Sequence, residues 1–196
     1  MVFKKYPSCG VTQGATELTL ALAAELGLQP AQVEAVEVRL PPYAHRLVGH
    51  PFAIGENPRV DAQFSVQYCV ANAIARGASR LSHFRVDAIR DPALAPLIDR
   101  VRAVADPAMD ARGHASVDVI LTTADGRRHV RGLDIPPGFP GNELSEAQHL
   151  ARFHDCLAYA GDTLAPEAAA RWLEAIERLE TLPDVRELIP LLVAAG

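Results

Sequence analysis

The chain has 196 residues, of which 49% are hydrophobic and 22% charged, and its formal net charge is −5 at pH 7. These values exclude a disordered, collagen-like or low-complexity chain. With 19 basic against 24 acidic residues and no basic block, we expect no nucleic-acid partner. No apolar run approaches the ~20 residues that cross a bilayer, so we expect no membrane partner.

The number and spacing of the cysteines indicate the redox environment of the protein. Cys9, Cys69 and Cys156 are odd in number and widely spaced, which argues against a disulfide framework and predicts a reducing, cytoplasmic environment. The N-terminal residues lack the apolar segment of a secretory signal. The cysteine spacing also excludes a local Cys-x-x-Cys metal knuckle, and we expect neither a metal nor an organic cofactor.

The first half of the chain alternates helix and strand patterns. Apolar residues at helical spacing predict a helix over residues 12–26. Alternation of apolar and charged residues predicts a half-buried strand over residues 36–40. The next segment, 41–60, is rich in Pro, Gly and His and is expected to form a loop. A second helix is predicted over residues 61–76, closed by Gly77.

The centre of the chain favours a sheet. Asp91-Pro92 opens a short helix that extends to about Asp99. Residues 100–105 alternate as a strand does. Two further strands, 115–123 and 127–135, are joined through Asp125-Gly126, a strong hairpin pattern.

The pattern becomes helical after residue 137. Ser145 and Gln148 form a capping box, Pro166 opens another helix, and residues 188–196 are uncharged and mostly aliphatic. We therefore predict an α+β fold: a small β-sheet layered with helices as a two-layer sandwich over residues 1–137, then a helical segment over residues 138–196. Because residues 145–196 carry much apolar surface, they either fold back on the sheet or meet another protein surface.

Two segments carry candidate chemistry. The run from Lys4 to Thr12 places cations, hydroxyls and a thiol just before a helix N-terminus, where an anion would be favoured. The alternative is a solvated tail with Thr12 as a helix cap. The second segment, residues 61–72, includes Tyr68, which is either a general acid or base or a core residue with its hydroxyl at the rim.

These segments resemble the C-terminal half of the MmgE/PrpD family. The pattern K-x-[YF]-P-[SC]-C begins at Lys4, and D-A-Q-F-S-x-x-Y runs from Asp61 to Tyr68. The Asp125-Gly126 hairpin and the segment from Pro137 to Ser145 extend the resemblance over nearly the whole chain. The family contains 2-methylcitrate dehydratases, cis-aconitate decarboxylases and an iminodisuccinate epimerase, which act on small di- or tricarboxylates.

The resemblance implies a domain organisation. Family members have a large helical domain and a smaller α+β domain, after which the chain returns to the helical domain. This sequence matches the small domain and the return. The resemblance thus implies a lyase or epimerase that needs a helical domain as a partner, contacted through residues 145–196, or a homo-oligomer.

The resemblance also implies residue roles. Lys4 and Tyr68 match family residues with catalytic roles: a cation for a substrate carboxylate and a hydroxyl that transfers or orients a proton. The same comparison implies substrate binding by the residues of the turn before the first helix and by a neighbour of Tyr68, namely Ser8, Cys9, Thr12, Gln13 and Ser65.

This sequence departs from the family at two positions. Gln13 stands where many members carry a histidine, and glutamine does not titrate near neutral pH. Cys9 stands where some decarboxylases carry a histidine, so decarboxylation is disfavoured, whereas dehydration and epimerisation stay open. The alternatives to an enzyme are a carboxylate-binding module without chemistry and a structural module that self-associates through residues 145–196.

Overall fold

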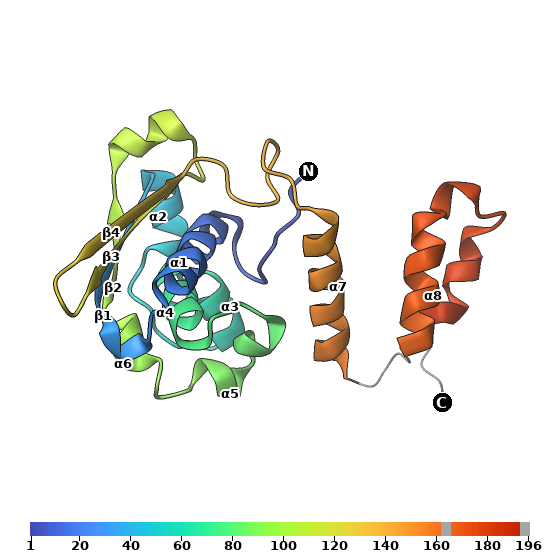
Figure 1. The fold of residues 1–196 in the computed structure, drawn as a ribbon, viewed down its shortest axis with the longest axis horizontal. Coiled ribbons are helices and arrows are strands. Elements are labelled where there is room, and N and C mark those ends of the chain that lie inside the picture. The colour runs from blue at the N-terminus through green and yellow to red at the C-terminus, as the bar shows by residue number, and fades with distance from the viewer. Residues whose placement is uncertain (162–165, 193–196) are drawn as a thin grey trace. The chain divides into compact units, whose positions relative to one another are not determined.

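The structure, a computed structural model, describes residues 1–161 and 166–192 (Figure 1). It forms two compact units, Met1–His149 and Leu150–Gly196. Within the described residues, no helix is both long and apolar enough to cross a membrane.

The first unit contains one sheet of four strands in the order β2-β1-β3-β4. β1 pairs in parallel with β2 and antiparallel with β3, and β3 and β4 form an antiparallel hairpin. The strands are β1 (Val33–Leu40), β2 (Val101–Ala105), β3 (Val117–Thr123) and β4 (Arg128–Leu133). All four predicted strands, and the hairpin at Asp125-Gly126, are confirmed.

The alternation of β1 decides which face of the sheet is buried. Val36 and Val38 are at most 1% exposed, whereas Glu37 and Arg39, which alternate with them, are half-buried and form an ion pair with each other. Since successive side chains of a strand point to opposite faces, the valines lie in the core and the charged pair lies on the other face.

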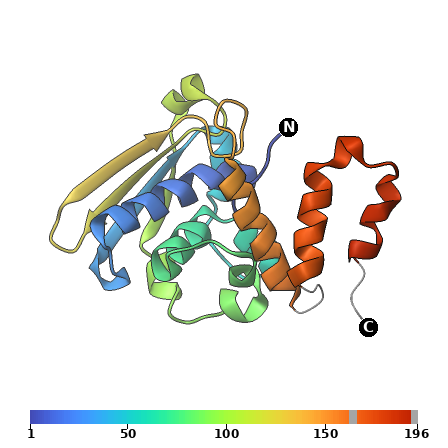
Figure 2. The same ribbon diagram turned by 45° about the vertical axis from the view of Figure 1, so that its right-hand side comes forward.

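Helices α1 (Gln13–Leu26) and α4 (Val66–Arg76) cover the apolar face of the sheet (Figures 1 and 2). Both helices end at a glycine in the left-handed region, Gly27 with φ 56° and Gly77 with φ 60°, where other residues are strained. The predicted ends of the two helices are confirmed.

The prediction that residues 41–60 form one loop was wrong in part: residues 49–57 contain no helix or strand, but a helix precedes them and another begins after them. Pro42 occupies the first turn of α2 (Pro42–Val48), because its fixed φ suits a helix start and its missing N–H is not needed there. In the same way Pro58, behind the cap residue Asn57, opens α3 (Pro58–Gln63).

The prediction of one helix over residues 61–76 was also wrong. α3 ends at Gln63 with Phe64 as its C-cap, and Ser65 then caps the start of α4 by accepting a hydrogen bond from the Tyr68 backbone N–H at 3.1 Å. A serine that satisfies a free N–H in this way favours a helix start over a helix interior.

Short helices complete the first unit, and η3 (Leu81–Phe84), α5 (Val86–Ile89) and α6 (Ala95–Ile98) among them pack at a second apolar cluster. That cluster comprises Ala62, Tyr68, Cys69, Phe84, Ile89 and Leu94. The other short elements are the 3-10 turns η1 (Gly10–Thr12), η2 (Pro30–Gln32) and η4 (Pro107–Arg112). The short helix predicted after Asp91-Pro92 is confirmed as α6, which begins later than expected.

The chain enters the second unit through α7 (Glu146–Ala160). The predicted capping box is confirmed: the Ser145 N–H donates to the Gln148 side chain at 2.8 Å, and the Gln148 N–H donates to Ser145 Oγ at 3.3 Å.

Inside the second unit, the rings of Phe153 on α7 and Trp172 on α8 (Pro166–Glu177) are stacked with centroids 5.5 Å apart. The turns η5 (Leu179–Thr181), η6 (Val185–Leu188) and η7 (Pro190–Leu192) follow, and the end of the predicted apolar run, 193–196, lies outside the described residues. A sheet layered with helices and followed by C-terminal helices confirms the predicted α+β fold.

Candidate functional site

The segment before α1 is fixed to three separate parts of the first unit. The Phe3 N–H donates to the Gly138 carbonyl at 2.9 Å. The Gln63 side chain on α3 donates to the Pro7 carbonyl at 2.9 Å, and the Cys9 N–H donates to the Gln63 carbonyl at 2.9 Å. The third attachment is to α1 and involves Gln13. A segment without regular secondary structure thus has a defined path.

The buried amide of Gln13 holds the backbone of this segment. Its Oε1 accepts from the Tyr6 N–H at 2.8 Å, and its Nε2 donates to the Tyr6 carbonyl at 3.0 Å. The same Nε2 lies 3.3 Å from Ser8 Oγ and 3.3 Å from the Cys9 carbonyl. Both ends of the amide are therefore engaged by the protein itself.

Glu17, one turn after Gln13 on α1, holds the side chains of the same segment. Its Oε2 accepts from Lys5 Nζ at 2.6 Å and from the Tyr6 hydroxyl at 2.5 Å. Burial, and then the Glu17 carboxylate, raise the pKa of Tyr6, so this phenol stays protonated. The sequence interpretation missed Glu17, although its spacing from Gln13 places both on one face of α1.

Lys4 differs from its neighbours. Its side chain is exposed, and it makes no hydrogen bond or ion pair with any residue in 1–161 or 166–192. The flanking residues Phe3 and Lys5 are both bound, through backbone and side chain respectively. Lys4 is therefore a cation that extends into solvent from a held backbone.

Ser8, Thr12 and the distant Cys69 form a buried polar cluster. Ser8 Oγ and Thr12 Oγ1 are 2.8 Å apart, and Thr12 Oγ1 also donates to the Cys9 carbonyl at 2.8 Å. Burial raises the pKa of the Cys69 thiol to about 12, although hydrogen bonds with Thr12 and Ser8 oppose part of the rise. Cys9 is half-buried, and Cys69 is fully buried.

Cys69 makes stability depend on pH above 9. Because the folded state keeps the thiol protonated while the unfolded chain loses the proton, the unfolding free energy should fall as pH rises from about 9 to 10. This single group should lower the unfolding free energy by about 1 kcal/mol between pH 9 and pH 10, and the slope should approach about 1.4 kcal/mol per pH unit above pH 10. Urea unfolding at closely spaced pH values measures it.

The control for this slope is a pair of matched variants. Cys69→Ala should flatten the pH profile between pH 9 and 10, whereas Cys156→Ala, at an exposed cysteine, should leave it unchanged. A slope that survives in Cys69→Ala would assign the titration to another group.

Tyr68, in the first turn of α4, and Ser65, the N-cap of that helix, are both buried. Tyr68 is 0% exposed, its ring packs between Phe52 and Phe84, and its hydroxyl donates to the His83 carbonyl. Arg76 donates to the same hydroxyl at 3.4 Å. The Ser65 hydroxyl caps α4 and donates to Gln67 at 3.1 Å. In this structure the Tyr68 hydroxyl is therefore satisfied by protein groups.

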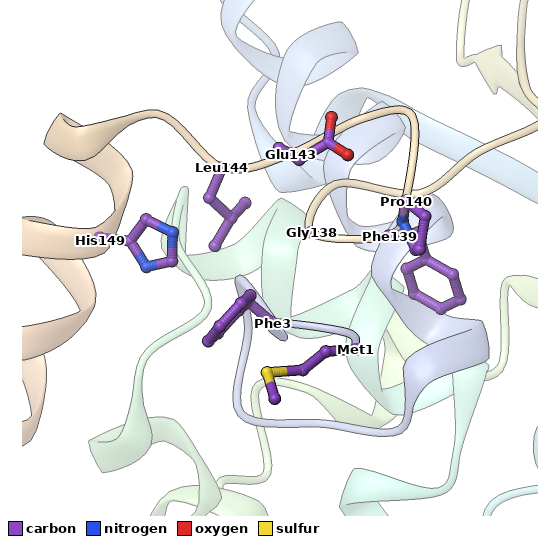
Figure 3. Close-up of a pocket in the computed structure, with 8 residues that line it drawn as sticks. All are labelled: Met1, Phe3, Gly138, Phe139, Pro140, Glu143, Leu144 and His149. Carbon is purple, nitrogen blue, oxygen red and sulfur yellow. The ribbon is translucent and has the colours of Figure 1, made fainter.

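A small pocket of about 170 Å³ lies beside the N-terminal segment (Figure 3). Phe3 and Leu144 lie near the ring of His149, and the Glu143 carboxylate points away from Phe3 and Met1. Glu143 accepts instead from the Gly141 N–H at 2.9 Å, and Phe3 meets His149 edge-on at 5.3 Å. The complete lining is Met1, Phe3, Gly138, Phe139, Pro140, Glu143, Leu144 and His149.

No group of three or more His, Cys, Asp or Glu side chains in the described part of the chain could hold a metal ion. The site residues predicted from the sequence are thus arranged in two sets. Ser8, Cys9, Thr12 and Gln13 are brought together at the start of α1, and Lys4 lies earlier on the same segment. Ser65 is the N-cap of α4, and Tyr68 lies in the first turn of that helix.

Comparison with known proteins decides the family. The model of the MmgE/PrpD C-terminal domain matches residues 6–181. The chain belongs to the MmgE/PrpD family. The match begins at Tyr6, just after Lys4, covers the rest of the first unit, and continues through α7 and α8 of the second unit to Thr181. No curated protein matches the chain.

Proposed function

We propose that this MmgE/PrpD domain forms part of a lyase (a dehydratase) or an epimerase that acts on a small di- or tricarboxylate, together with a large helical domain. The observation that carries the proposal is Lys4: an exposed ammonium that has no partner among residues 1–161 and 166–192, on a backbone segment that is bound on both sides. Family membership supports the substrate class.

The chemistry of such a reaction explains why a fixed cation would matter. Removing a proton from a carbon next to a carboxylate moves negative charge onto the carboxylate oxygens. A cation already in position stabilises that charge without reorganising, so its effect is largest in the transition state. Lys4 would supply this charge. The Ser8 and Thr12 hydroxyls, which are buried and bonded to each other, would have to separate before they and Cys9 could bind the rest of the substrate.

Tyr68 has a conditional role in the proposal. Its hydroxyl would have to leave the His83 carbonyl before it could donate to or accept from a substrate. A proton-transfer role for Tyr68 therefore requires movement of η3, the turn that carries His83. Ser65 would act beside it as the cap that sets the first turn of α4.

The exposed apolar residues of the second unit favour a further candidate function. Leu179, Val185 and Ile189 are 43%, 61% and 61% exposed. We propose that residues 145–196 bind another protein surface, which is either a helical domain or a second copy of the chain. Sedimentation of the chain at increasing concentration tests the second copy, since a monomer throughout would contradict it.

The test of the carboxylate site is a thermal-shift screen of the chain against citrate, 2-methylcitrate, cis-aconitate and itaconate. A ligand at a hundred times its dissociation constant adds about 2.7 kcal/mol of stability, which is easily measured. We expect at least one acid to raise the melting temperature, and Lys4→Ala to abolish the rise while leaving the stability of the free protein unchanged, because the Lys4 side chain is exposed and has no partner in the described part of the chain.

Arg128→Ala is the matched control, because it removes one exposed positive charge from β4. It should keep the shift. A shift that is unchanged in Lys4→Ala would contradict the role of Lys4, and the absence of any shift from the four acids would contradict carboxylate binding by this chain.

A further inference from the structure

The side chain of Gln13 has no free hydrogen-bonding group to offer a ligand. It is 0% exposed, its Oε1 accepts from the Tyr6 N–H at 2.8 Å, and its Nε2 donates to the Tyr6 carbonyl at 3.0 Å. The two bonds imitate the pairing of one residue with a neighbouring strand. A direct contact between this amide and a substrate would break them and leave buried backbone groups unsatisfied.

The residue that Gln13 fixes lies two positions after Lys4. Glu17, on the same face of α1, adds bonds to Lys5 and to the Tyr6 hydroxyl at 2.6 and 2.5 Å. On the other side, Phe3 is bound to Gly138. The Lys4 backbone is thus held from both directions, and its side chain alone is left without a partner among the described residues.

We propose that Gln13 is a positioning residue that acts on a bound carboxylate through Lys4. This proposal rests on the carboxylate site proposed above. By fixing Tyr6, Gln13 orders the backbone that carries Lys4, so a carboxylate meets a cation whose backbone is already ordered. Preorganisation of this kind strengthens binding because the ordering cost is met during folding.

Gln13→Leu tests the proposal without changing the net charge. We expect amide hydrogen exchange to accelerate at least tenfold at Tyr6, while amides of α4 keep their protection. For whichever acid binds the unmodified chain, the dissociation constant should rise at least fivefold. The matched control is Gln32→Leu, since the exposed Gln32 side chain bonds only the Gln29 N–H of its own turn; neither quantity should change there.

A double-mutant cycle separates positioning from general damage. If Gln13 acts through Lys4, Gln13→Leu weakens binding in the unmodified chain but not further in Lys4→Ala. Equal weakening in both backgrounds would overturn the proposal. If Gln13→Leu fails to fold, Gln13→Met, which is closer to glutamine in shape and also lacks the amide that bonds the Tyr6 backbone, takes its place in the cycle with the same expected coupling.

Hydrogen exchange distinguishes failure of this proposal from failure of the carboxylate site. If no acid binds the unmodified chain, the carboxylate site is contradicted, and accelerated exchange at Tyr6 in Gln13→Leu still supports the holding role of Gln13. Unchanged exchange at Tyr6 would overturn that role whether or not an acid binds.

Discussion

Replacing Tyr68 with alanine should lower the unfolding free energy by about 3–5 kcal/mol, the range for large buried aromatic side chains. Tyr68 is 0% exposed and packs against Phe52 and Phe84, with ring centroids 5.4 and 5.5 Å away. The substitution opens a cavity between these rings and removes the hydroxyl that donates to the His83 carbonyl. Urea denaturation followed by circular dichroism measures the loss.

Tyr43→Ala is the matched control for Tyr68→Ala. Tyr43 lies on α2 and is 50% exposed, so its removal should change stability by less than about 0.5 kcal/mol. Equal effects of the two substitutions would contradict the burial of Tyr68. A loss below about 1 kcal/mol for Tyr68→Ala would mean that the residue stands clear of the core, as a residue facing a substrate would.

Gly138→Ala should be the second most damaging of these substitutions, at about 3 kcal/mol. Gly138 has φ +84°, and a Cβ atom there would lie 1.7 Å from the Phe3 carbonyl oxygen. Left-handed strain accounts for about 1–2 kcal/mol and overpacking for about 1–3 kcal/mol. Because the obstacle is backbone, relief requires the N-terminal segment to move away, so exchange of the Phe3 amide should accelerate as well.

Gly77→Ala separates the cost of backbone strain from the cost of steric overlap. Gly77 also has a positive φ, +60°, but a Cβ atom there would meet nothing within 4 Å. This variant should therefore lose only the strain, about 1–2 kcal/mol. If Gly138→Ala were no more damaging than Gly77→Ala, the close approach of Phe3 to Gly138 would be contradicted.

The sequence correctly predicted the elements that depend on a single local pattern of residues. The alternation of β1 and the Asp125-Gly126 turn are read within a few residues, and both are confirmed. The helices at Pro42 and Pro58 were missed because the Pro, Gly and His content of residues 41–60 was interpreted as a loop, although proline also fits a helix start.

The candidate site was predictable only in part. The residues before α1 were found because they are adjacent in sequence, and the structure groups Ser8, Thr12 and Gln13. Their tertiary partners Gln63 and Cys69 come from α3 and α4, and no local pattern links them to residues 4–13. For Tyr68, residue type and spacing do not distinguish a core residue from a proton donor; burial does.

The order of the strands in the sheet determines which strand pairs can form first during folding. β3 and β4 are joined by a tight turn, so this hairpin can close locally, on a time scale of roughly microseconds. β1, by contrast, finds Val101 of β2 and Leu121 of β3 only after long loops close, and such closures slow folding. We therefore expect the hairpin to form first and β1, the strand between β2 and β3, to be the last to gain both of its neighbours.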